Sequence, residues 1–329
     1  MNQIITLENG ISLNLNNHNF TAKAVNAIKA SGDIFIPRSI HFESNEYVIR
    51  SIDKGTFREN KSIKSLAFPL DSELHLIEGE AFSNSSIEQI TIPSSCEELK
   101  EGCFLDALKL NHILISPRNN FFNYVDPEQK MISRKSQKSN ETFDALAFSC
   151  HDIIDANIPT TIEEIGPFSF YRCSNLKSVK FSKDSKLHLI DKCAFLSSSL
   201  KQIVIPKHVT HIKEYSFSEC ERLFDFQIEK DSELREIGQC AFSKTSLLNV
   251  VIPKSVKIIG ECAFSMCSLM KSIEFLSDDL KCEKFCFYLC RNLSLVSFPN
   301  TNVVPIKINA HDSVNFDFSL FVCAYSTIE

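Results

Sequence analysis

A phenylalanine that returns at a nearly fixed interval is the feature that most limits how this chain can fold. Nine such residues, which we call the anchors, follow one another at gaps of 22 to 25 residues, apart from one gap of 66: Phe57, Phe82, Phe104, Phe170, Phe195, Phe217, Phe242, Phe264 and Phe287. An aliphatic residue lies five positions before each of the first eight anchors, and Cys282 lies five before the ninth. Self-similarity at this interval is typical of a solenoid, in which each coil is stabilised by its neighbours.

A short alternating run of apolar residues ends ten or eleven positions after each anchor. In one coil the run is Leu200, Ile203 and Ile205, and Pro206 follows it. This alternation predicts a strand with one buried face, and Pro can follow because it ends the strand without removing a ladder hydrogen bond. The expected strand ends are Phe68, Ile92, Ile115, Ile158, Phe181, Ile205, Ile228, Ile252, Phe275 and Phe298.

Two coil types alternate along the repeat. In the longer type the strand runs into Asp-Ser-x-Leu, as at residues 184–187, and in the shorter type it turns through Ile-Pro, as at residues 205–206. The interval of 22 to 25 residues falls in the range of leucine-rich repeats and below that of all-helical repeats. We therefore expect a right-handed solenoid of leucine-rich-repeat type. It should have one continuous parallel β-sheet, short turns or helical turns on its other sides, and little regular helix.

The repeat resembles that of the BspA-like leucine-rich-repeat family, a group often called surface antigens. The best copy runs from Ile252 to Cys267 and reads Ile-Pro-x-x-Val-x-x-Ile-Gly-x-x-Ala-Phe-x-x-Cys. The resemblance covers roughly residues 34–300. Two features of the pattern are kept in only some coils. Gly follows the aliphatic residue only at Gly166, Gly238 and Gly260, and Cys lies three after the anchor only at Cys173, Cys220, Cys267 and Cys290.

The repeat also suggests how the chain is divided. Residues 1–51 are expected to form an N-terminal cap with a degenerate first repeat, residues 52–115 leucine-rich repeats, and residues 116–150 an insertion. We expect this insertion to be a hairpin with a polar loop. Repeats then resume over residues 151–300, and residues 301–329 form a C-terminal cap, because an uncapped end coil would expose its apolar interior.

Composition removes several classes of function. A net charge of −6 on 329 residues has the wrong sign for a nucleic-acid-binding surface. The first residues show neither the basic nor the apolar part of a signal peptide, and no stretch approaches the ~20 apolar residues of a membrane span. These observations favour a cytoplasmic protein. The family resemblance implies a second possibility, namely a location at the cell surface.

The 13 cysteines are best explained as small buried packing residues, because Ala or Ser replaces them at equivalent positions of other coils. Disulfides between coils would need suitable geometry and an oxidising compartment, and Cys240 with Cys262 is the adjacent-coil pair that we single out. A metal site at Cys282, Cys286 and Cys290 is disfavoured because no His lies nearby.

Catalytic and cofactor motifs are missing from the sequence as well. His208 and His211 have no matching carboxylate cluster in sequence, and the chain holds no nucleophile elbow and no phosphate-binding glycine loop. We therefore predict no catalytic residue, no cofactor, no metal and no enzymatic activity.

The remaining function is the binding of another macromolecule, most simply a protein, along an extended surface. The candidate surface is the solvent side of the strands, formed by Lys177, Lys180, Gln202, Val204, Asp225, Gln227, Asn249, Val251, Ser272 and Glu274. The family resemblance implies an adhesion or surface-interaction protein. The alternative is an intracellular scaffold of the same fold with a cytosolic partner.

Overall fold

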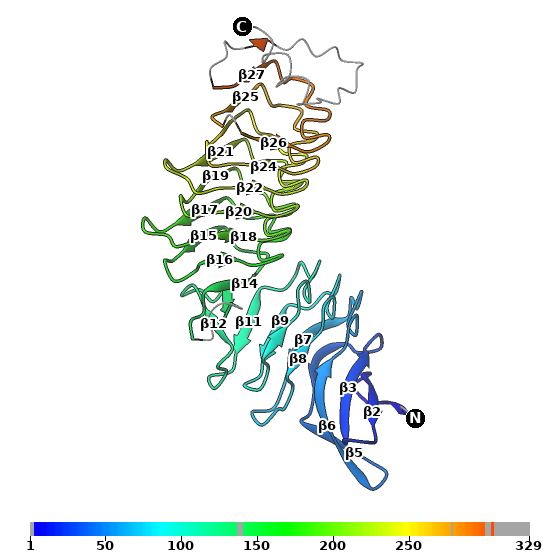
Figure 1. Cartoon of the computed structure of the whole chain (residues 1–329). Helices are drawn as coiled ribbons and strands as arrows, with labels where there is room; N and C mark the ends of the chain where they lie inside the picture. The colour runs from blue at the N-terminus through cyan, green and yellow to red at the C-terminus, as the bar shows by residue number, and fades with distance from the viewer. Residues whose placement is uncertain (1–2, 137–140, 278, 300–303, 306–329) are drawn as a thin grey trace. The chain divides into compact units, whose positions relative to one another are not determined.

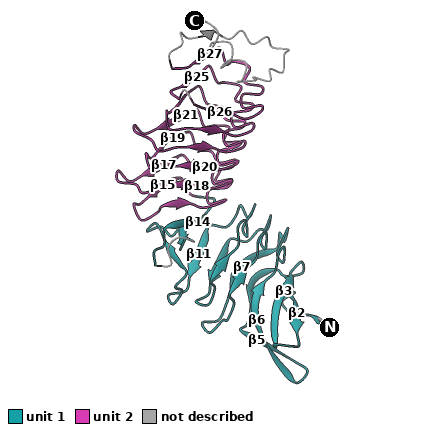
Figure 2. Ribbon diagram, viewed as in Figure 1, with its two compact units in different colours: residues 1–152 teal, residues 153–329 magenta. Residues whose placement is uncertain are grey.

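The computed structural model describes residues 3–136, 141–277, 279–299 and 304–305 (Figure 1). The chain forms two compact units, residues 1–152 and residues 153–329 (Figure 2). Both are built from short parallel strands stacked coil upon coil, which confirms the solenoid fold. No described residue lies in an α-helix, and the described part of the chain accordingly offers no helix able to cross a membrane. The C-terminal cap expected at 301–329 lies outside the described residues, apart from residues 304–305.

The first unit begins with an antiparallel sheet. β1 (Gln3–Thr6), β2 (Ser12–Asn16) and β3 (Thr21–Asn26) pair antiparallel in succession. β3 then pairs parallel with β6 (Asn45–Ile52), which also forms a hairpin with β5 (Ser39–Phe42). The segment expected to cap the repeat therefore has a fold of its own, while its role as a cap stays a prediction.

Two parallel ladders follow in the first unit. One consists of β4 (Gly32–Phe35), β7 (Ile63–Ala67), β9 (Gln89–Ile92) and β11 (His112–Ile115). The other continues from β6 through the two-residue strands β8 (Leu76–Ile77) and β10 (Glu98–Leu99). The unit ends in an antiparallel meander of β12 (Phe122–Tyr124), β13 (Met131–Arg134) and β14 (Ala145–Ser149).

The second unit repeats the same two ladders. Its long strands are β15 (Asp155–Ile158), β17 (Ser178–Phe181), β19 (Gln202–Ile205), β21 (Asp225–Ile228), β23 (Asn249–Ile252), β25 (Ser272–Phe275) and β27 (Leu295–Ser297), and β28 (Val304–Pro305) pairs antiparallel with β27. Its two-residue strands are β16 (Glu164–Ile165), β18 (Leu189–Ile190), β20 (His211–Ile212), β22 (Glu236–Ile237), β24 (Ile258–Ile259) and β26 (Lys281–Cys282). Eight of the ten expected strand ends coincide with observed ends, and the other two strands end one residue earlier, at Ala67 and Ser297.

The structure differs from expectation in which strands form the continuous sheet. In the described part of the second unit, the two-residue strands pair without a break from β16 to β26. The long strands instead form separate ladders, namely β15–β17, β19–β21 and β23–β25–β27. The aliphatic residue before each anchor is not recognisable in the sequence as part of a strand, because two residues are too few to show an alternation.

In the second unit the breaks between ladders follow the two coil types, whereas in the first unit β7 and β9 pair across the longer coil. Strand ends 23 residues apart, such as Ile205 and Ile228, belong to paired strands, whereas Ile228 and Ile252, 24 apart, belong to separate ladders. The 24-residue step contains the Asp-Ser-x-Leu turn, which the Ser side chain closes by accepting the Leu amide proton, as in Ser232 Oγ with Leu234 N at 3.1 Å. This turn places eight residues between Ile228 and Ile237, whereas the shorter coil has six between Ile205 and Ile212, and in the second unit the long strand after this turn begins a new ladder.

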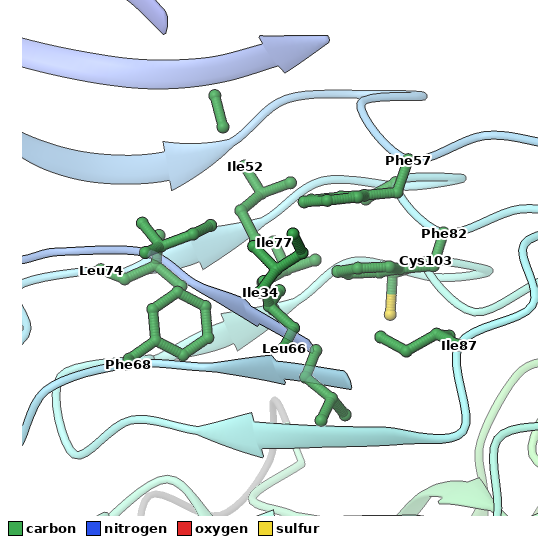
Figure 3. Close-up of a cluster of buried hydrophobic side chains, with 14 of the residues drawn as sticks. Ile34, Ile52, Phe57, Leu66, Phe68, Leu74, Ile77, Phe82, Ile87 and Cys103 are labelled. Carbon is green, nitrogen blue, oxygen red and sulfur yellow. The ribbon is translucent and has the colours of Figure 1, made fainter. Parts of the chain in front are cut away.

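The anchors fill the interior of both units. In the first unit Phe57 and Phe82 stack with ring centroids 4.9 Å apart beside the aliphatic ladder of Ile52 and Ile77 (Figure 3). In the second unit the rings from Phe170 to Phe287 stack at 4.9 to 5.6 Å with planes within 8° of parallel. Such pairs add about 0.5–1.5 kcal/mol each beyond the area that they bury.

The turn around each anchor forms a third hydrogen-bonded ladder. The residues two before and two after the anchor have left-handed backbones, for example Cys240 (φ 51°) and Lys244 (φ 59°). The amides of Cys240, Phe242 and Lys244 donate to carbonyls of the next coil at 2.9, 2.7 and 2.9 Å. A left-handed residue other than Gly costs about 1–2 kcal/mol, and the hydrogen bonds and packing of each coil offset this cost.

Candidate binding surface

The residues proposed from the sequence as a binding surface lie in or directly beside the long strands of the second unit. We call these ten residues the strand face. Eight of them are exposed and two, Asp225 and Ser272, are half-buried. Between them the inward residues, such as Val179 and Ile203, are buried. Alternation along each strand therefore separates the strand face from the core.

A groove indents this face where the long-strand ladder is interrupted between β21 and β23. Its volume is about 640 Å³. Four strand-face residues line it, namely Asp225, Gln227, Asn249 and Val251. The turn after each strand completes the walls, and Leu276 of the next coil lies at one side. The alternation of apolar residues predicts an unbroken sheet and therefore no groove; the 24-residue steps of the second unit are the sequence signal that marks the breaks in its long-strand ladder.

The groove combines apolar and charged groups. Val251 and Leu276 are 48% and 42% exposed, so two aliphatic side chains face solvent. Around them Asp225 accepts hydrogen bonds from the Gln227 amide at 3.0 and 3.2 Å, which holds the carboxylate in place. Glu229 accepts a bond from the backbone N–H of Lys207 at 3.0 Å. This arrangement suits contact with a surface of mixed polarity rather than with a uniformly charged polymer.

The two histidines that lacked carboxylate neighbours in sequence acquire them from the next coil. His208 Nδ1 lies 3.0 Å from Glu233 and His211 Nε2 lies 3.9 Å from Glu236. Each histidine thus has one carboxylate neighbour, which lies 25 positions away in sequence and comes close when the coils stack. Burial, followed by the nearby Lys213, lowers the pKa of His211. The other ring nitrogen of His211, Nδ1, lies 2.8 Å from the Thr210 hydroxyl.

The twelve cysteines of the described residues are all thiols, and Cys323 lies outside them. Cysteines three after the anchor are buried and donate to the carbonyl of the preceding anchor: Cys220 Sγ to Phe195 O at 3.0 Å and Cys267 Sγ to Phe242 O at 3.1 Å. Cys267 and Cys290 lie in adjacent coils, three after the successive anchors Phe264 and Phe287. No group of three or more His, Cys, Asp or Glu with metal-binding geometry occurs among the residues that the structure describes.

Comparison with known families identifies the repeat. The model of the BspA type leucine-rich repeat region matches six copies, over residues 37–126, 141–267 and 188–315. This chain belongs to the BspA-type leucine-rich-repeat family. It is therefore a repeat scaffold, and the resemblance recognised in the sequence is confirmed. A comparison with curated proteins gives no match.

Solved structures of leucine-rich-repeat proteins share the fold. A leucine-rich-repeat protein from Bacteroides ovatus is 22% identical, with a TM-score of 0.58 over 89% of this chain and 70% of its own. One from Eubacterium ventriosum is 16% identical, with a TM-score of 0.58 over 95% and 99%. The pneumococcal vaccine antigen PcpA is 14% identical, with a TM-score of 0.55 over 91% and 88%.

Proposed function

We propose that this BspA-type protein is a non-enzymatic scaffold that binds a protein partner through the strand face of its second unit. The observation that carries the proposal is the groove between β21 and β23, which interrupts the face and exposes Val251 and Leu276 among charged neighbours. Apolar side chains surrounded by a polar rim are typical of the centre of a protein interface. Full burial of an exposed aliphatic side chain contributes about 1.5–3 kcal/mol, and covering these two, which are already about half buried, contributes about half of that each.

The partner that fits this surface is a folded protein or peptide outside the cell, because the chain is similar to repeat proteins that include a vaccine antigen. On this reading the scaffold acts in adhesion or surface interaction. A cytosolic partner is the second candidate, and the observation that favours it is the set of twelve described thiols, since thiols persist in reducing compartments.

The location test uses intact cells that produce the protein. A membrane-impermeant amine reagent should modify lysines such as Lys180 if the scaffold works at the surface. Modification only after the cells are lysed would instead favour the cytosolic scaffold. Lys180 suits this purpose because it is exposed on the strand face.

The surface test compares two valines at equivalent strand positions. Val251 lines the groove and is 48% exposed, whereas Val204 lies outside it and is 47% exposed. A photo-reactive amino acid at position 251 should capture the partner in producing cells, after which the affinity of the purified pair can be measured. Val251→Glu should raise the Kd about tenfold or more, which corresponds to about 1.4 kcal/mol, and Val204→Glu, on the strand face but outside the groove, should raise it by a smaller factor. Equal affinities for the wild type and Val251→Glu would contradict the proposed site.

A further inference from the structure

Two cysteines lie side by side in neighbouring coils at the surface of the second unit. Cys240 and Cys262 both occupy the position two before an anchor. The amide of Cys240 donates to the carbonyl of Glu261 at 2.9 Å, and Glu261 directly precedes Cys262. The φ angles of the two cysteines are 51° and 56°, so the backbone has the same left-handed conformation at both residues.

This register suits a covalent link between the coils. Hydrogen-bonded neighbouring segments lie about 4.7–4.9 Å apart. The Cα atoms of a disulfide are separated by about 4.4–6.8 Å. The spacing between the two coils falls within this range, so a disulfide needs no change in that spacing. In-register cysteines of adjacent coils therefore satisfy the main geometric requirement.

Both thiols are also within reach of small reagents. Cys240 and Cys262 are half-buried, and their neighbours in the same column, Tyr215 and Phe285, are 38% and 36% exposed. Burial is the main cause that raises the pKa of Cys262, and the adjacent Cys240 thiol and the Glu261 carboxylate add to it. The two thiols therefore interact directly across the boundary between the coils.

A second adjacent pair has the same spacing but a different environment. Cys267 and Cys290 lie three after the same kind of anchor and are 0% and 2% exposed. Their sulfurs donate to the carbonyls of Phe242 and Phe264 at 3.1 and 3.0 Å. Because solvent cannot reach them, they serve as a buried comparison for the half-buried pair of Cys240 and Cys262.

We propose that Cys240 and Cys262 are a thiol–disulfide exchange site that forms a reversible bond between two coils. The co-reactant is a small-molecule disulfide such as oxidised glutathione. One cysteine thiolate attacks a glutathione sulfur, which breaks the glutathione disulfide, forms a mixed disulfide and releases one glutathione thiolate. The second cysteine thiolate attacks the protein sulfur of that mixed disulfide, which forms the Cys240–Cys262 bond and releases the other glutathione. The two protons lost by the cysteines go to the two glutathione thiolates.

The new bond would close a loop that contains β23. Residues 249–255, between the two cysteines, include Asn249, Val251 and the following turn, which form one wall of the groove. The bond would restrain this wall in an oxidising setting and leave it unlinked in a reducing one. Oxidised protein should consequently unfold at a higher denaturant concentration than reduced protein, because a cross-link restricts the unfolded chain.

The test exposes the reduced full-length protein to oxidised glutathione at neutral pH without denaturant, then alkylates it and digests it with trypsin. Trypsin leaves Cys240 in peptide 236–244 and Cys262 in peptide 258–271. Mass spectrometry should find these two peptides joined through Cys240 and Cys262, and dithiothreitol should separate them.

Three variants complete the test. Cys240→Ser and Cys262→Ser should each abolish the joined peptides, whereas Cys267→Ser should retain them, which matters because Cys267 lies in the same tryptic peptide as Cys262. The proposal is overturned if the native wild type yields no such link, if the link maps to Cys267, if it forms only in denatured protein, or if glutathione adducts form without it.

Discussion

Each interior anchor lies between the rings of two neighbouring coils. Phe242 is fully buried, and its ring centroid is 5.0 Å from that of Phe217, 5.2 Å from that of Phe264 and 4.5 Å from that of Phe226. The same residue type therefore packs against both of its faces. This explains why Phe recurs with little substitution, since a smaller side chain would leave a gap that the stacked coils cannot close.

Phe242→Ala should lower the free energy of unfolding by about 3–5 kcal/mol, because the lost ring leaves a cavity between two coils. Lys180→Ala, on the strand face, should change it by less than about 0.5 kcal/mol. Urea unfolding followed by circular dichroism measures both. Equal losses would mean that the inward and outward faces have been exchanged.

The buried thiols give the protein a distinctive response to alkaline pH. Burial raises the pKa of Cys220 to about 12, above its value of about 8.5 in an unfolded chain. Between these values the unfolded state releases a proton that the folded state retains, so the free energy of unfolding falls as the pH rises. Cys220→Ser keeps a hydroxyl donor but removes this ionisation. Its stability should therefore fall less steeply than that of the wild type from about pH 9 upward, as measured by urea unfolding at a series of pH values. Parallel slopes would show that Cys220 does not ionise on unfolding.

At the scale of the element, two neighbouring coils approach each other closely at Gly260, which leaves no room for a side chain. Gly260 donates its amide to Ile237 O at 2.7 Å, and a Cβ at Gly260 would lie 2.6 Å from Gln239 N and 2.7 Å from Gly238 C. Those atoms belong to the backbone of the preceding coil and cannot rotate away. Other coils carry Asp191 or Lys213 at the equivalent position, so the close approach is local to these glycine-containing coils.

Gly260→Ala should accordingly cost about 1–3 kcal/mol, the usual range for overpacking. Lys213→Ala, at the equivalent position of an earlier coil, should cost less than about 0.5 kcal/mol because it only shortens a side chain. Thermal unfolding of the two variants beside the wild type measures the difference. A neutral Gly260→Ala would show that the coils can separate slightly without loss.

At the scale of the whole molecule, each coil contacts mainly the coils before and after it. Stability in such an array is approximately a sum of coil and neighbour terms, so damage in one coil spreads only as far as the coupling between neighbours. The two compact units each have a core of this kind.

Hydrogen exchange of Phe242→Ala should show this locality. Amides of the coils around residue 242 should lose protection, while those of β7 and β9 in the first unit keep the protection that they have in the wild type. Mass spectrometry of peptides from both units makes the comparison. A uniform loss would instead indicate that the entire chain unfolds as one cooperative body.

The sequence by itself determined the fold, the positions of most long strands, the burial of the anchors and the outward direction of the strand face. These features follow from local periodicity, since an alternating run such as Leu200 to Ile205 has one face that must be buried. The pattern recurs with nine anchors, and this repetition, rather than the match of any one coil, makes a chance resemblance negligible.

Only the tertiary structure decided which residues of different coils meet. His208 lies beside Glu233, and Cys240 lies beside Cys262, although the members of each pair are 25 and 22 positions apart in sequence. The strands β21 and β23, by contrast, are neighbours along the repeat and do not pair. Whether such residues touch depends on register: the 24-residue step separates β21 from β23 at the groove, yet β7 and β9 pair across a step of the same length. Periodicity constrains each coil, but register depends on the stacking of complete coils.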